Sequence, residues 1–170
     1  MVGFMFTGIL GTLLHFAFEW TGNSVIAALV SAVNESIWEH TKLLFYPMVL
    51  FALIQYKVWG REVADFWCIK LVGILAGLIL IPVLYYTYSG ILGISADWFN
   101  ITIFFIAAAA AYFLETKLFQ RDHSCRIPAW AAIAVLCVLA AVYTVLTFYP
   151  PEIPFFRDPV TGTYGFFQRQ

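Results

Sequence analysis

Five long apolar stretches, separated by short polar segments, set the pattern of the chain. A helix needs about 20 apolar residues to cross a hydrocarbon core of about 30 Å, and each stretch is of that order. Helices are favoured over a barrel because the apolar residues lack the alternation typical of barrel strands. The predicted spans cover residues 3–20, 36–57, 67–88, 98–118 and 129–149. We therefore expect an all-α integral membrane protein, built as a five-helix transmembrane bundle.

The apolar stretch 25–56 is too long for one ordinary span, because a helix of that length would measure about 48 Å. Ser36 and Glu39 have the S-x-x-E spacing of a capping box, so a new helix is expected to begin at Ser36. Residues 25–33 would then cover only about 14 Å, which predicts a short re-entrant or interfacial segment before span two. A single span over 24–45 is the alternative, but it would expose the apolar residues that follow to water.

The end of the chain has a different composition. Prolines 151, 154 and 159 predict turns and extended chain in place of a helix. The chain therefore divides into a five-span transmembrane domain, 1–149, and a Pro- and aromatic-rich tail, 150–170. The sequence RDPVTGTYG within the tail favours a compact turn. Such a tail would act either as a lid or as an interfacial cap.

Composition supports the membrane assignment, since 62% of the residues are hydrophobic and only 11% are charged. The lipid bilayer is therefore the expected environment of the chain. A net charge of −1 without a basic cluster argues against nucleic acid as a partner. Cys68, Cys125 and Cys137 form no CxxC pair, and we interpret them as packing residues or free thiols.

The basic residues predict the orientation in the cell membrane. Most of them flank the second and fourth loops: Lys57, Arg61, Lys70, Lys117, Arg121 and Arg126. The positive-inside rule makes those loops and the N-terminus cytoplasmic. The tail becomes extracytoplasmic, although Arg157 and Arg169 lie there. Glu115, two residues from Lys117, is interpreted as an ordinary charge at the cytoplasmic edge.

The sequence SAVNESIWEH, residues 31–40, concentrates polar groups in an apolar chain. His15 and Glu19 are four residues apart, as are Glu35 and Glu39, so each pair is expected on one helical face. The predicted fold brings both pairs to the outer side, together with His40. Imidazoles and carboxylates on facing helices suit a divalent metal such as zinc, iron or manganese.

A wider ligand site would take in neighbouring polar residues at the same level of the bundle. It would contain Asn34, Glu35, Glu39, His40, Asp97 and Tyr88. The alternative interpretation is structural: Asn34 caps a helix, Glu39 pairs with Lys42, and Tyr88 belongs to an interfacial aromatic belt. Ionisable groups at membrane depth nevertheless favour a functional site.

The stretches VNESIWEHTKLLFYP and YPPEIPFFRDPVTGTYG resemble a family of small bacterial multi-pass membrane proteins. This family is common in Gram-positive anaerobes and is known only as a domain of unknown function. The resemblance covers the whole chain and implies that the outward motif and the tail belong to one arrangement. It implies no activity.

Three functions compete. The first is a binding or transport protein that holds a cation or small polar ligand at the outward Glu/His/Asn site. The second is a membrane-embedded, metal-dependent enzyme acting on a lipid or lipid-linked substrate. The third is purely structural: a small subunit whose polar cluster holds its helices together, with a homo-oligomer or a partner membrane subunit as the possible assembly.

Overall fold

A computed structural model describes residues 1–93, 97–121 and 125–167. Its helices are α1 (Val2–Trp20), α2 (Val25–Ala28), α3 (Ile37–Val58), α4 (Phe66–Leu92), α5 (Asp97–Phe119) and α6 (Ala129–Phe148), with the 3₁₀ helices η1 (Gly60–Glu62) and η2 (Pro154–Phe156). Five of these helices are long and apolar enough to cross a membrane. The predicted all-α fold with five spans is therefore confirmed.

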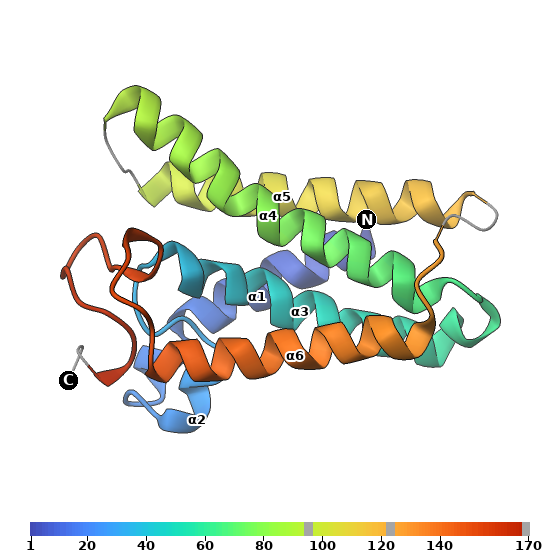
Figure 1. The fold of residues 1–170 in the computed structure, drawn as a ribbon, viewed down its shortest axis with the longest axis horizontal. Coiled ribbons are helices and arrows are strands. Elements are labelled where there is room, and N and C mark those ends of the chain that lie inside the picture. The colour runs from blue at the N-terminus through green and yellow to red at the C-terminus, as the bar shows by residue number, and fades with distance from the viewer. Residues whose placement is uncertain (94–96, 122–124, 168–170) are drawn as a thin grey trace.

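Helix α3 occupies the centre of the bundle and contacts each of the other four long helices. Helices α4 and α5 lie side by side and form one layer, with α1 and α6 packed on other sides of α3 (Figure 1). Small residues allow the α4–α5 contact, since Ala107, Ala108 and Ala111 are all fully buried. A Cβ on Gly77 would lie 3.2 Å from Ala111 Cβ, so the two backbones approach closely there.

Helix α1 fits against α3 and α5 through glycines on one face. A Cβ on Gly11 would lie 2.7 Å from the backbone oxygen of Leu43 and 2.7 Å from a ring atom of Phe104. A side chain at Gly8 would meet Phe105 at 3.0 Å. The absence of side chains at these positions therefore sets how deeply α1 sits in the bundle.

The chain folds back between α1 and α3, as the length argument predicted. Helix α2 is a single turn, and α3 begins directly after Ser36. The Ser36 hydroxyl accepts a hydrogen bond from the Glu39 N–H at 3.4 Å, which is the predicted N-cap. Asn34 Oδ1 accepts from the Ser36 N–H at 3.0 Å, so Asn34 shapes the turn that precedes the cap.

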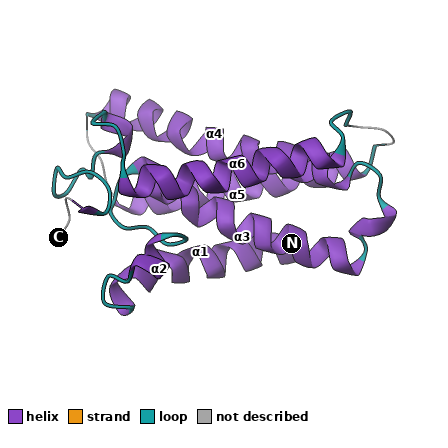
Figure 2. Ribbon diagram, turned by 60° about the horizontal axis from the view of Figure 1, so that its bottom comes forward, coloured by secondary structure: helices purple, strands orange, loops and turns teal. Residues whose placement is uncertain are grey.

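The loops gather at two ends of the bundle (Figure 2). At the end that holds η1, Cys68 and Cys125 form a disulfide with a Cα–Cα distance of 5.9 Å. The interpretation of both as packing residues or free thiols was wrong, and it holds only for Cys137, which is free and exposed. The two partners are 57 residues apart. Their pairing depends on how α4 and α5 pack, so no short sequence motif predicts it.

A second correction concerns Lys70 and Glu115, which form a buried ion pair between α4 and α5. Glu115 is therefore not an ordinary charge at the membrane edge, and Lys70, which flanks the second loop, is buried inside α4. Four aromatic rings surround the Lys70 ammonium group at 5.5 to 6.0 Å: Phe51, Phe66, Tyr112 and Phe119. Cation–π attraction adds to the ion pair in holding this charge inside the bundle.

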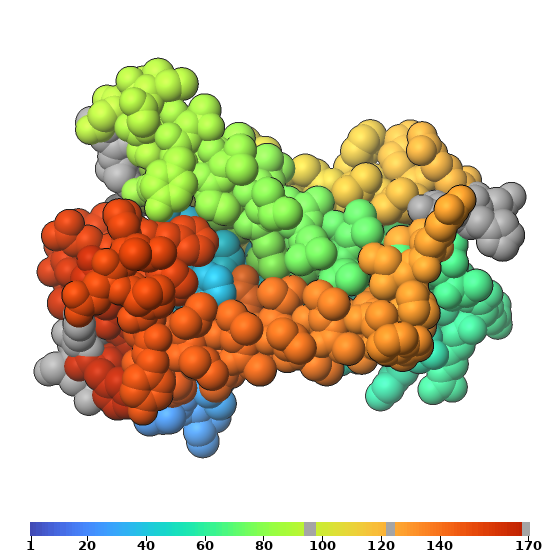
Figure 3. Space-filling model, in the orientation of Figure 1, coloured from blue at the N-terminus to red at the C-terminus, as the bar shows by residue number. Residues whose placement is uncertain are grey.

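The tail packs onto the opposite end of the bundle and covers part of it, while the end of α4 stays clear of it (Figure 3). Phe156 and Phe166 are buried, and the Phe166 N–H donates to the Thr147 carbonyl at 2.9 Å. Within RDPVTGTYG, the buried Asp158 accepts from the N–H groups of Val160 and Thr161, which closes a compact turn as predicted. The tail is thus held against the bundle by both aromatic packing and hydrogen bonds.

Candidate metal centre

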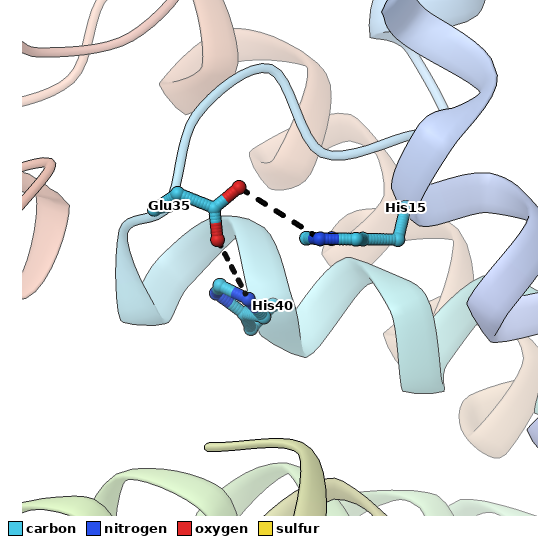
Figure 4. Close-up of side chains that lie close together, drawn as sticks. All are labelled: His15, Glu35 and His40. Carbon is cyan, nitrogen blue, oxygen red and sulfur yellow. Dashed lines mark ion pairs between the residues drawn. The ribbon is translucent and has the colours of Figure 1, made fainter. Parts of the chain in front are cut away.

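Three side chains from separate parts of the chain meet beside the tail: His15 of α1, Glu35 of the turn before α3, and His40 of α3. One carboxylate oxygen of Glu35 lies 3.8 Å from His15 Nε2 and the other lies 3.4 Å from His40 Nε2. Figure 4 shows the carboxylate directed toward both imidazoles. One potential ligand atom from each residue lies within 4.8 Å of the others. The predicted meeting of α1 with the start of α3 is therefore observed.

The proton arrangement of His40 follows from its backbone contact. Nδ1 lies 2.9 Å from the Ser36 carbonyl oxygen, which only accepts hydrogen bonds, so Nδ1 carries a proton. In the neutral ring, the lone pair is then on Nε2, which faces Glu35. Two acceptors at 3.4 Å repel each other unless a proton or a metal ion lies between them. A backbone hydrogen bond at one nitrogen is also the usual way in which a ligating histidine is oriented.

Glu35 lies in the turn and not in the helix. Ser36 is the N-cap and the helix starts at Ile37, so Glu35 and Glu39 do not share a helical face as the four-residue spacing suggested. The turn instead directs Glu35 toward His40 and across to α1. This placement makes Glu35 the bridge between the two histidines.

Glu39 occupies a separate, buried network. Its carboxylate lies 2.7 Å from Lys42 Nζ and accepts from the Val33 N–H at 3.0 Å and the Thr147 hydroxyl at 3.2 Å. Lys42 also donates to the Ala28 carbonyl and to Thr147, both at 2.9 Å. The structure thus places Glu39 outside the three-residue group and in the ion pair that was the structural alternative.

A cavity of about 320 Å³ adjoins the histidines. Its lining comes from α1, the turn before α3, α3 itself, α5 and the tail: Gly11, Thr12, His15, Phe16, Glu35, His40, Leu43, Asn100, Ile101, Phe104, Phe105 and Val160. Most of the lining is apolar, and the charged or titratable groups are at one side. The cavity therefore offers space for a second molecule next to the cluster.

The remaining predicted residues have varied positions. Tyr88 donates to Asn100 Oδ1 at 2.6 Å, so it orients a residue that lines the cavity. Glu19 is exposed and lies outside the cluster, and Asn34 is buried in the turn. The side chain of Asp97 falls outside the described part of the chain.

The aromatic and tail residues that line the cavity were not predicted. Phe104, Phe105 and Val160 belong to apolar or turn segments, where nothing in the sequence distinguishes cavity residues from lipid-facing ones.

The fold and the cluster define a multi-pass membrane protein with a Glu/His group at one end of its bundle. Within that class, the chain belongs to the family of unknown function DUF6512, whose model matches residues 1–166. No curated protein and no solved structure matches the chain. The family identifies no activity, so function must be argued from the site.

Proposed function

We propose that the protein binds a divalent transition-metal ion through His15, Glu35 and His40. Two imidazoles and a carboxylate are donors that zinc, iron and manganese accept. Donor atoms in a tetrahedral site with bonds of about 2.0 Å lie roughly 3.3 Å apart. The three potential ligand atoms lie within 4.8 Å of one another, and the 3.8 and 3.4 Å contacts of Glu35 use different carboxylate oxygens. Side-chain rotations must therefore bring the donors closer together around an ion.

The contact between His40 and Glu35 is the observation that carries this proposal. In the neutral ring, Nδ1 of His40 donates to the Ser36 carbonyl and the other nitrogen presents its lone pair to a carboxylate oxygen 3.4 Å away. A metal ion in place of a proton between these two acceptors satisfies both of them, and His15 would complete a three-residue ligand set.

Three protein ligands leave at least one coordination position free, which is the arrangement of metal sites that act on or hold a second molecule. The adjoining cavity gives that position access to about 320 Å³ of space. Ion transport and metal-dependent chemistry on a lipid, the alternatives from the sequence, would both use this bound ion. We therefore propose metal binding as the property common to them.

Metal analysis of the purified protein tests the proposal. The protein, carrying a tag without histidines, would be purified in detergent without chelator and analysed by inorganic mass spectrometry. We expect near-stoichiometric zinc, iron or manganese in the parent, and a loss of roughly tenfold or more in His15→Ala, His40→Ala and Glu35→Gln.

Glu19→Gln is the matched control, because Glu19 is a carboxylate of α1 near His15 that lies outside the cluster. This variant should retain the metal. A parent protein without stoichiometric metal after incubation with each of the three ions, or equal metal content in the His40→Ala variant, would contradict the proposal.

A further inference from the structure

Helices α1 and α5 are in contact along one half of their length and separate along the other. They are joined where Thr7 Oγ1 lies 2.8 Å from the Tyr112 hydroxyl, and where Gly8 faces Phe105. Beyond Gly11, toward the end of α1 and the beginning of α5, the cavity occupies the space between them. The metal cluster lies at this wider end.

The rim of the cavity is on the flank of the bundle. Phe16 of α1 is 42% exposed, and Ile101 and Phe105 of α5 are 59% and 37% exposed. Phe16 and Ile101 are each four residues, about 6 Å, inside the ends of their helices. Large apolar side chains exposed at that depth on a membrane-spanning helix face acyl chains. The cavity is therefore open toward the bilayer.

The tail contributes one residue to the wall of the cavity. Val160 is part of the cavity lining, and the turn that carries it is fixed by the buried Asp158. A molecule that enters between Phe16 and Ile101 meets an apolar passage first and the Glu/His group afterwards.

Charge determines which head group fits. A divalent ion with two neutral imidazoles and the Glu35 carboxylate has a net charge of +1. Glu39 adds no uncompensated charge, because it is paired with Lys42 on the buried side of α3. An oxyanion of charge −1 at the free coordination position would neutralise the site, and the mostly apolar lining of the adjoining cavity favours such neutrality.

We infer that the cavity binds an anionic amphipath from the bilayer, with its oxyanion head on the metal and its acyl chain leaving between Phe16 and Ile101. This inference rests on the proposed metal site. The head is a carboxylate or a phosphate, and the same experiment distinguishes a fatty acid from an anionic phospholipid.

Photolabelling in membranes tests the inference. Metal-analysed protein would be reconstituted in phosphatidylcholine vesicles with a diazirine-bearing fatty acid, and the labelled peptides would be mapped by mass spectrometry. We expect labelling to concentrate on the α1 and α5 segments that contain Phe16 and Ile101. An excess of palmitate should reduce the labelling if the site prefers a carboxylate head, and an excess of phosphatidate should reduce it if the site prefers a phosphate. Extra phosphatidylcholine should not reduce it.

Two variants make the test specific. Ile101→Trp fills the entrance and should remove most of the labelling while leaving the metal content unchanged. Ile106→Trp is the matched control, because Ile106 is an exposed isoleucine of α5 that does not line the cavity. Removal of the metal with a chelator should abolish the labelling in the parent.

The outcomes separate the two proposals. Protein without metal contradicts the metal site itself. Metal-loaded protein whose labelling is spread over all exposed helices, or is unaffected by Ile101→Trp, overturns the lipid inference alone. Competition by neither palmitate nor phosphatidate would overturn it as well.

Discussion

Two carboxylates four residues apart are held in very different surroundings. The side chain of Glu35 is 42% exposed and bridges two histidines at the cavity. Glu39 is 1% exposed and is surrounded by an ammonium group, a hydroxyl and a backbone N–H. The exposed carboxylate of Glu35 is therefore compatible with the proposed binding role, whereas the contacts of Glu39 within the protein favour a structural role.

The buried ion pair makes a prediction for stability. Lys42→Met keeps a long apolar stem but leaves the Glu39 carboxylate without its counter-ion, so the free energy of unfolding should fall by about 3–5 kcal/mol. The double variant with Glu39→Gln removes both charges and should recover most of this loss. Unfolding of both variants in detergent measures the difference.

The same double variant should keep its metal, since neither residue belongs to the three-residue ligand set. Loss of metal in a double variant that remains folded would indicate that Glu39 is a metal ligand after all. A change of less than about 0.5 kcal/mol in the single variant would show that the pair does not stabilise the fold.

Among the helices, α1 has the most sensitive position, because its glycine face brings His15 to the other two residues of the proposed metal site. Gly11→Val would place methyl groups against the Leu43 carbonyl and the Phe104 ring, since even a Cβ at this position would lie 2.7 Å from each. We expect α1 to be displaced from α3 and α5, with loss of metal and a clear fall in thermal stability.

Gly90→Ala provides the comparison, because a Cβ on Gly90 meets nothing within 4 Å. That variant should retain its metal and be as stable as the parent, or slightly more stable, owing to the higher helix propensity of alanine. If Gly11→Val bound metal normally, the close packing of α1 would not be what positions His15.

The spans and the break before α3 were predictable because both depend on local quantities, hydrophobic length and capping at Ser36. Two of the predicted ligands, Glu19 and Glu39, lie outside the cluster. Their prediction assumed that residues four apart share a helical face, but Glu35 lies in the turn before the helix. Helical spacing also does not show which face of a helix is buried. The Lys70–Glu115 pair and the disulfide were missed for another reason. Their partners are 45 and 57 residues apart and meet only through tertiary packing.

For the molecule as a whole, the orientation in the membrane is the main prediction still to be tested. The basic residues Arg61 and Arg121 belong to the end that carries the disulfide, and the positive-inside rule makes this end cytoplasmic. Disulfides persist mainly in oxidising compartments, which favours the opposite orientation. We expect the orientation that the basic residues predict, in which the tail and the proposed metal site lie outside the cell.

Single cysteines in a background without the three native cysteines test this orientation. In intact cells, Thr161→Cys should react with a membrane-impermeant maleimide, and Arg61→Cys should react only after permeabilisation. Both positions are exposed, so accessibility to the reagent is comparable. The reverse labelling pattern would place the disulfide-bearing end on the oxidising side and the metal site in the cytoplasm.

The contact of Thr147 with both Lys42 and Glu39 ties the beginning of α3 to the last long helix. During synthesis, α3 reaches the membrane long before residue 147 has left the ribosome. Until then, the charged pair lacks one of its polar partners in a medium where unsatisfied polar groups are costly. A chain interrupted before α6 would therefore hold an incomplete polar network inside the bilayer and should be less stable than the complete chain.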